Sequence, residues 1–284
     1  MLKKLIKHEW KSTSKMGGII MLAIAGMTLV SFLGIALPIG YLGGDIRKAD
    51  GGLIDVLSIM TMMMSTMLCV FALVGITYGL LIYLGVRFYK TMYSEEGYLT
   101  HTLPVTPRQL LLSKTLVAGL WYVLVELGIM LSIFILIVVG IIIPLGGFDN
   151  VWWELAQAAD MMDGAAYVEL IHLIIFMLVA IIITPFSTMM LLFGSITIGQ
   201  LFNRFKAFMG ILVFMGVVFV NSLLAGIVSI PFTVLGGIVG VNTAMGTFIL
   251  MFGVYDMPVI GVVALAVAFY FISHRILERK LNLE

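Results

Sequence analysis

Long stretches with almost no formal charge constrain this sequence most. Four of them exceed the roughly 20 apolar residues that a helix needs to cross a hydrocarbon core of about 30 Å: 16–44, 56–86, 115–148 and 170–202. Glu126 is the one carboxylate inside any of them. A charge-free run over 207–255 and a last apolar segment ending near His274 supply two more spans. We therefore predict an all-α membrane protein with six transmembrane helices, forming a single transmembrane domain over 1–284.

The composition excludes a water-soluble fold. Hydrophobic residues make up 62% of the chain and charged residues 11%, whereas soluble domains carry about 25% charged residues. The basic N-terminus followed by an apolar stretch also fits a signal peptide, but the charge-free part of 16–44 exceeds the roughly 7–15 residues of a signal-peptide core. We expect the segment to be retained as a helix. The single cysteine, Cys69, excludes a disulfide within the chain.

The charges between the spans predict the topology. Lys and Arg accumulate on cytoplasmic loops, and here they gather at both termini and after the second and fourth spans. The other three connections hold only Arg47 and Lys48, together with most of the carboxylates. We expect a multi-pass protein of the cytoplasmic (plasma) membrane with both termini in the cytoplasm. Trp152 and Trp153 in the third connection predict a short outer interfacial helix starting at Asn150, and a simple connector is the alternative.

Two further segments have membrane signatures of their own. Residues 1–15 place apolar side chains on one face and lysines beside it, the pattern of a helix lying in the interface. The apolar run after Lys206 is too long for two spans, and its excess, 230–254, contains Pro231 and several glycines. Such a segment at membrane depth must pack on protein or line a cavity. We expect a re-entrant pair of short helices on the outer side, and an overlong tilted fifth helix is the alternative.

The second connection, 87–114, carries the strongest local signals. Ser94 is a candidate N-cap, and Glu95 and Glu96 follow it in the first turn, where the helix dipole favours anions. Pro104 prevents this short helix from continuing. Thr106 and Pro107 then start the next helix as N-cap and first helical residue. We predict a short, ordered cytoplasmic helix followed by a sharp restart.

No sequence motif points to catalysis or to a cofactor or metal site in this chain. A P-loop, a His-Glu-x-x-His segment and a Cys/His cluster are all missing from the sequence. The histidines are scattered near the predicted membrane boundaries, where polar tips of this kind are common: His8, His101, His172 and His274. Glu126 lies well inside a span, and two roles remain open for it, lining a translocation pathway or making a helix–helix contact.

The order of these parts resembles the permease subunit of ABC-2 type exporters. The resemblance covers nearly the whole chain, and its most specific stretch is 93–114, with Glu-Gly-x-Leu at 96–99, Leu-Pro at 103–104 and Leu-x-x-x-Lys at 110–114. It implies that this loop is a coupling helix seated in a cleft of a separate ATPase subunit. The residues that it assigns to coupling are Tyr93, Ser94, Glu95, Glu96, Gly97, Tyr98, Leu99, Leu103 and Pro104.

The resemblance also implies the partners. A P-loop ATPase subunit would hold ATP and Mg²⁺, a second permease, identical or homologous, would complete the pathway, and membrane lipids would surround both. Nothing points to nucleic acid. The cargo would be amphipathic or apolar, such as a peptide antibiotic, a drug or a lipid-like molecule.

Other functions stay open. A secondary transporter would need paired ionisable groups near the midplane, where the sequence offers only Glu126. A membrane enzyme would need a reactive cluster that the sequence does not suggest. A non-transporting membrane accessory or assembly protein is opposed only by the structured second connection.

Overall fold

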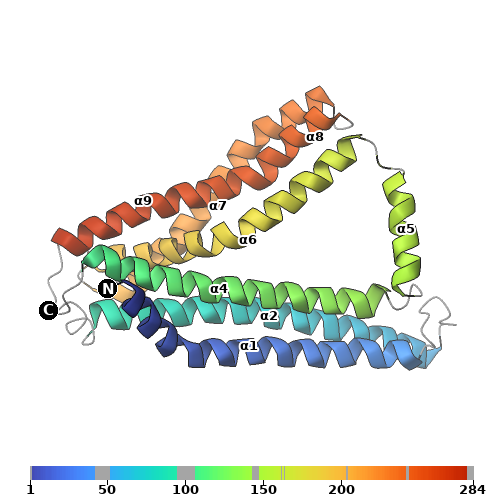
Figure 1. Cartoon of the computed structure of the whole chain (residues 1–284), viewed down its shortest axis with the longest axis horizontal. Helices are drawn as coiled ribbons and strands as arrows, with labels where there is room; N and C mark the ends of the chain where they lie inside the picture. The colour runs from blue at the N-terminus through green and yellow to red at the C-terminus, as the bar shows by residue number, and fades with distance from the viewer. Residues whose placement is uncertain are drawn as a thin grey trace. The chain divides into compact units, whose positions relative to one another are not determined.

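A computed structural model describes residues 2–41, 52–94, 106–142, 147–160, 162, 164–202, 204–240 and 243–279. All the regular structure in these ranges is helical (Figure 1). The elements are α1 (Leu2–Tyr41), α2 (Leu53–Tyr93), α4 (Pro107–Ile137), the π-helical turn η2 (Val138–Ile142), α5 (Phe148–Asp160), α6 (Gly164–Gly199), α7 (Lys206–Val239), α8 (Ala244–Met251), the π-helical turn η3 (Phe252–Asp256) and α9 (Met257–Arg279).

The described part of the chain contains six helices long and apolar enough to cross a membrane, as the sequence predicts. Each has 33 to 41 residues, which at about 1.5 Å per residue exceeds the thickness of a hydrocarbon core. Large apolar side chains cover their surfaces; Leu22, Phe71 and Leu178 are 74%, 65% and 64% exposed. Apolar surface of this extent is stable only against lipid or another apolar partner. The chain is therefore a multi-pass membrane protein.

The starts of α4 and α5 can be compared with the sequence predictions. The Thr106 hydroxyl accepts a hydrogen bond from the Gln109 amide at 3.3 Å, and Pro107 is the first residue of α4. This confirms the predicted cap. A helix, α5, also occupies the third connection, where the sequence left a helix or a connector open. It begins at Phe148, two residues before Asn150, and both of its tryptophans are exposed.

The chain divides into two compact units, which are described separately. Unit 1 consists of Met1–Ser12, Leu81–Val123 and Met162–Glu284, and unit 2 of Thr13–Leu80 and Leu124–Met161. In unit 2 the spans of α1, α2 and α4 lie side by side (Figure 1). Ile35, Ile39 and Val139 form a small buried apolar core there.

Hydroxyl groups join the helices of unit 2. The Thr28 and Ser132 hydroxyls lie 2.6 Å apart between α1 and α4. Ser31 and Ser65 each donate to the other's backbone carbonyl, at 3.3 Å and 3.1 Å, between α1 and α2. Small hydroxyl residues let helices approach closely and supply hydrogen bonds that lipid cannot. These contacts, rather than a large apolar core, give unit 2 its helix register.

In unit 1, α6 packs against α7, α8 and α9. The Phe88 ring of α2 stacks on Phe193 of α6 with centroids 4.1 Å apart, and both side chains are fully buried. Gly119 of α4 lies so close to the Phe186 ring that a Cβ at this position would overlap it. Stacked rings and a close glycine contact thus hold the ends of α2 and α4 in unit 1 against α6.

The two special membrane segments differ in detail from the expectation. Residues 2–15 are the first part of α1 rather than a separate helix, because no proline interrupts the helix between them and the span. Residues 230–239 continue α7 through Pro231 up to the C-cap Gly240, and α8 runs through η3 into α9 without a break, so that Met245–Leu277 form one long helix. The interfacial position of 1–15 and the re-entry of 230–254 into a membrane stay predictions.

Candidate functional site around Glu9

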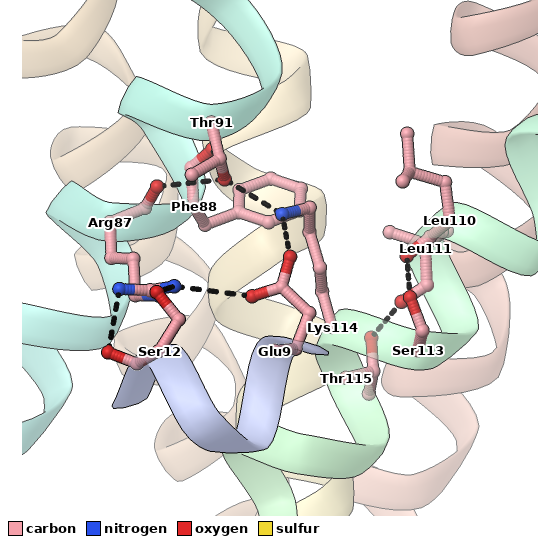
Figure 2. Close-up of polar contacts among 10 residues, drawn as sticks. All are labelled: Glu9, Ser12, Arg87, Phe88, Thr91, Leu110, Leu111, Ser113, Lys114 and Thr115. Carbon is pink, nitrogen blue, oxygen red and sulfur yellow. Dashed lines mark hydrogen bonds and ion pairs between the residues drawn. The ribbon is translucent and has the colours of Figure 1, made fainter. Parts of the chain in front are cut away.

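A buried ionic cluster joins three segments of unit 1 that are far apart in the sequence. Glu9 comes from α1, Arg87 and Thr91 from α2, and Lys114 from α4 (Figure 2). The Lys114 ammonium lies 2.5 Å from Glu9 Oε1, and the Arg87 guanidinium lies 3.4 Å from Glu9 Oε2. One carboxylate thus bridges two cations on two other helices.

Hydroxyl groups complete the cluster. Lys114 Nζ also donates to the Thr91 hydroxyl at 2.8 Å, and Arg87 donates to the Ser12 hydroxyl at 2.6 Å (Figure 2). Glu9 and Ser12 are three positions apart on α1, and Arg87 and Thr91 are four apart on α2, so each pair shares one helix face. On α1 and on α2, the residues of the cluster therefore lie on a single face of the helix.

The cluster is too buried to be an ordinary surface ion pair. The side chains of Lys114 and Glu9 are 6% and 15% exposed, and that of Arg87 is 22% exposed. Exposed ion pairs contribute about 0–1 kcal/mol, whereas removing one partner of a buried pair costs about 3–5 kcal/mol, because a charge is left uncompensated. The bridge is therefore a strong constraint on where the N-terminal helix lies.

An aromatic contact reinforces this attachment. The ring of Trp10, next to Glu9, stacks on Trp121 of α4 with centroids 4.7 Å apart and planes 14° from parallel. Trp121 is buried. The sequence places Trp10 on the apolar face of an interfacial helix, and the structure gives that face a protein partner in α4.

A cavity of about 550 Å³ opens beside the cluster. Its lining includes Glu9, Arg87 and Lys114 together with His8 and Lys90. Among the described residues of the lining positive charge exceeds negative charge, since Glu9 is the one carboxylate among them. The site can hold helices together electrostatically, and it forms no grouping of three or more potential metal ligands within the described ranges.

The end of α2 is fixed a second time, against α6. The Tyr93 hydroxyl donates to the Thr197 hydroxyl at 2.8 Å. Thr197 is fully buried, and its own hydroxyl donates to the Phe193 carbonyl. Tyr93 is therefore held at the last residue of α2, and exposed Ser94 follows it.

The sequence-predicted site residues divide into three groups. Tyr93 and Ser94 are described, at the end of α2. The other predicted coupling residues lie outside the described residues: Glu95, Glu96, Gly97, Tyr98, Leu99, Leu103 and Pro104. Glu126 lies on α4 in unit 2, partly exposed, and makes no ion pair or hydrogen bond with the part of the chain that the structure describes.

Sequence reasoning missed Glu9, Arg87 and Thr91 as members of one site. One signal was present, because Glu9 is the sole carboxylate before Asp45 and stands among five lysines. Its partners could not be read from the sequence, since Lys114 lies 105 positions away.

No protein-family model, curated protein or solved structure matches the chain.

Proposed function

We propose that the chain is the permease subunit of an ATP-driven exporter of the ABC-2 type. In this proposal it moves an amphipathic or apolar cargo across the cytoplasmic membrane. A separate P-loop ATPase subunit binds ATP and Mg²⁺ and drives the transport, and a second permease, identical or homologous, completes the pathway. The segment between α2 and α4 docks on the ATPase.

The bridge from Glu9 to Arg87 and Lys114 carries the proposal. Arg87 lies close to the end of α2 and Lys114 close to the start of α4, so the two cations flank the predicted coupling segment in the chain. Glu9 links both to the N-terminal helix. A push on the segment would therefore reach α1, α2 and α4 together, as a coupling device requires.

The contacts of α2 with α6 extend this path. Tyr93, the first predicted coupling residue, donates to Thr197, and one turn earlier Phe88 stacks on Phe193. Closely packed side chains transmit displacement because they resist compression. A movement at the end of α2 would reach α6 and, through it, the helices α7 to α9 that pack on it.

The test is whether an ATPase accompanies the chain. We would purify the tagged protein in mild detergent from the membranes of its own cells. We expect a P-loop ATPase, identified by mass spectrometry, and vanadate-sensitive ATP hydrolysis in the same fraction. Double charge reversal, Glu95→Lys with Glu96→Lys, should abolish both.

A matched control changes a carboxylate in the connection predicted to lie outside. Glu154→Lys should leave the amount of bound ATPase unchanged. If wild-type chain purifies without any ATPase, the exporter proposal is wrong. If the charge-reversed chain keeps its ATPase in full amount, the coupling role of 95–104 is wrong.

A further inference from the structure

A groove of about 640 Å³ runs between α6 and the α8–α9 segment within unit 1. On α6 its lining falls at helical spacing from His172 through Phe176, Val179 and Ala180 to Ile183. On the facing side it runs from Asp256 of η3 to Ala264 of α9. Steps of three and four residues keep a stripe on one face of a helix. The α6 stripe is about 16 Å long at 1.5 Å per residue.

The groove is polar at one end and apolar along its length. His172 Nε2 lies 3.0 Å from Asp256 Oδ2, yet the imidazole nitrogen is not aligned for a hydrogen bond with the carboxylate. Both side chains are mostly buried, at 14% and 21% exposed. The Asp256 carboxylate can therefore pair with a further cationic group. The other side chains that the structure describes in the lining are apolar.

A π-helical turn brings the acid to this position. Phe248, Phe252 and Asp256 follow one another at steps of four residues, and all three line the groove. In a regular α-helix each step of four overshoots one face by about 40°. The wider turn η3, Phe252–Asp256, absorbs this overshoot. Turns of this kind are frequent at functional sites.

The polar end favours a cation. With Asp256 ionised, the pair carries one negative charge when His172 is neutral and no net charge when His172 is protonated. Two aromatic rings line this end of the groove: Phe248 meets the His172 ring edge-to-face at 5.7 Å, and Phe252 lies against Phe248 at 6.3 Å. Aromatic faces beside a carboxylate attract ammonium groups.

We propose that this groove binds a single-chain cationic amphiphile, its ammonium group at Asp256 and its alkyl chain along the α6 stripe. The apolar lining matches a linear alkyl chain along the length of the stripe. The identification of this amphiphile as cargo rests on the proposed function. The binding does not depend on the proposed function, because the lining residues all belong to this chain.

The test uses dodecyltrimethylammonium as the probe. Binding of the radiolabelled compound is measured on the full chain in nanodiscs of zwitterionic lipid, without any ATPase. We expect saturable binding that unlabelled probe displaces and that dodecyl sulfate, with the same tail and the opposite charge, displaces poorly. Asp256→Asn should weaken binding about tenfold, the loss expected for about 1.4 kcal/mol.

Two matched pairs of variants complete the test. Asp160→Asn removes an exposed carboxylate of α5 and should leave affinity unchanged. Ala180→Phe fills the groove and should weaken binding, whereas Leu178→Phe enlarges a side chain of α6 outside the groove lining and should not.

The charge variant and the competitor decide the outcome even if Ala180→Phe fails to fold. The proposal is overturned if Asp256→Asn binds as tightly as wild type, or if dodecyl sulfate competes as well as the unlabelled probe. Equal binding of every single-chain amphiphile would mean an unselective lipid groove and would also overturn it. If the wild-type chain purifies without any ATPase in the earlier experiment but still binds the probe, the exporter proposal alone is wrong.

Discussion

Replacing Glu9 by Gln should weaken the attachment of residues 2–12 to α2 and α4 within unit 1. The change preserves the size of the side chain but leaves Lys114, 6% exposed, with Thr91 as a neutral partner. A fully buried pair would lose about 3–5 kcal/mol. Because Glu9 itself is 15% exposed and Arg87 keeps its hydrogen bond to Ser12, we expect the attachment of the N-terminal helix to lose about 2–3 kcal/mol, at or below the lower end of that range.

This loss should be local. Opening of one segment appears as faster amide exchange in that segment alone. In hydrogen-exchange mass spectrometry, the opening of residues 2–12 should become about 30- to 150-fold more frequent, as 2–3 kcal/mol implies. Peptides from α7 should exchange as in wild type. The Trp10–Trp121 stack, disrupted in the same opening, should change the tryptophan emission in parallel.

Two controls separate the bridge from general charge effects. Lys7→Gln removes an exposed charge of the same helix and should alter exchange little. The double variant Glu9→Gln with Lys114→Met removes both charges, so its cost should fall below the sum of the single costs by about 1–2 kcal/mol. Equal exchange in Glu9→Gln and Lys7→Gln would refute the assignment of the bridge as a constraint.

Other substitutions test the packing of unit 1. Gly119→Ala should destabilise the protein by about 1–3 kcal/mol, because its Cβ would overlap a ring of α6. Gly26→Ala, where a Cβ meets nothing within 4 Å, should instead stabilise the protein by about 0.5–1 kcal/mol through helix propensity. Unfolding in mixed micelles measures both free energies, and equal effects of the two substitutions would contradict the overlap at Gly119. Tyr93→Phe should lower the free energy of unfolding by about 1 kcal/mol in the same assay, because the hydrogen bond to Thr197 of α6 is lost. The control Tyr78→Phe, at an exposed position, should leave stability unchanged. A Tyr93 variant as stable as wild type would show that this hydrogen bond contributes nothing.

The helical membrane fold was predictable because its signals are local. Charge-free runs longer than a bilayer is thick allow few structures other than spanning helices. The start of α4 was equally readable, since Thr106 and Pro107 act on the backbone within one turn. The continuity of α7 was harder to predict. Pro231 and the glycines around it suggested a break, but α7 continues to Val239. In lipid, breaking a helix exposes backbone groups that nothing else would satisfy.

The candidate site depended on long-range pairing. Lys114 ends the Leu-x-x-x-Lys motif and Arg87 is a basic residue after the second span, but nothing local indicates that both meet Glu9. The pairing of His172 with Asp256 has the same character, since each reads alone as a polar residue near a membrane boundary. Contacts between distant residues depend on which helix faces pack, and apolar helices offer little amphipathic pattern to reveal those faces.

Site-specific photocrosslinking tests the central claim most directly. A benzoylphenylalanine at Ser94, exposed at the end of α2, would be irradiated in intact cells, with the same residue at Asp160 as the control position. We expect an adduct between position 94 and a P-loop ATPase, identified by mass spectrometry, and none from position 160. An ATPase adduct from position 160, or adducts from position 94 only with proteins of the opposite side of the membrane, would contradict the account.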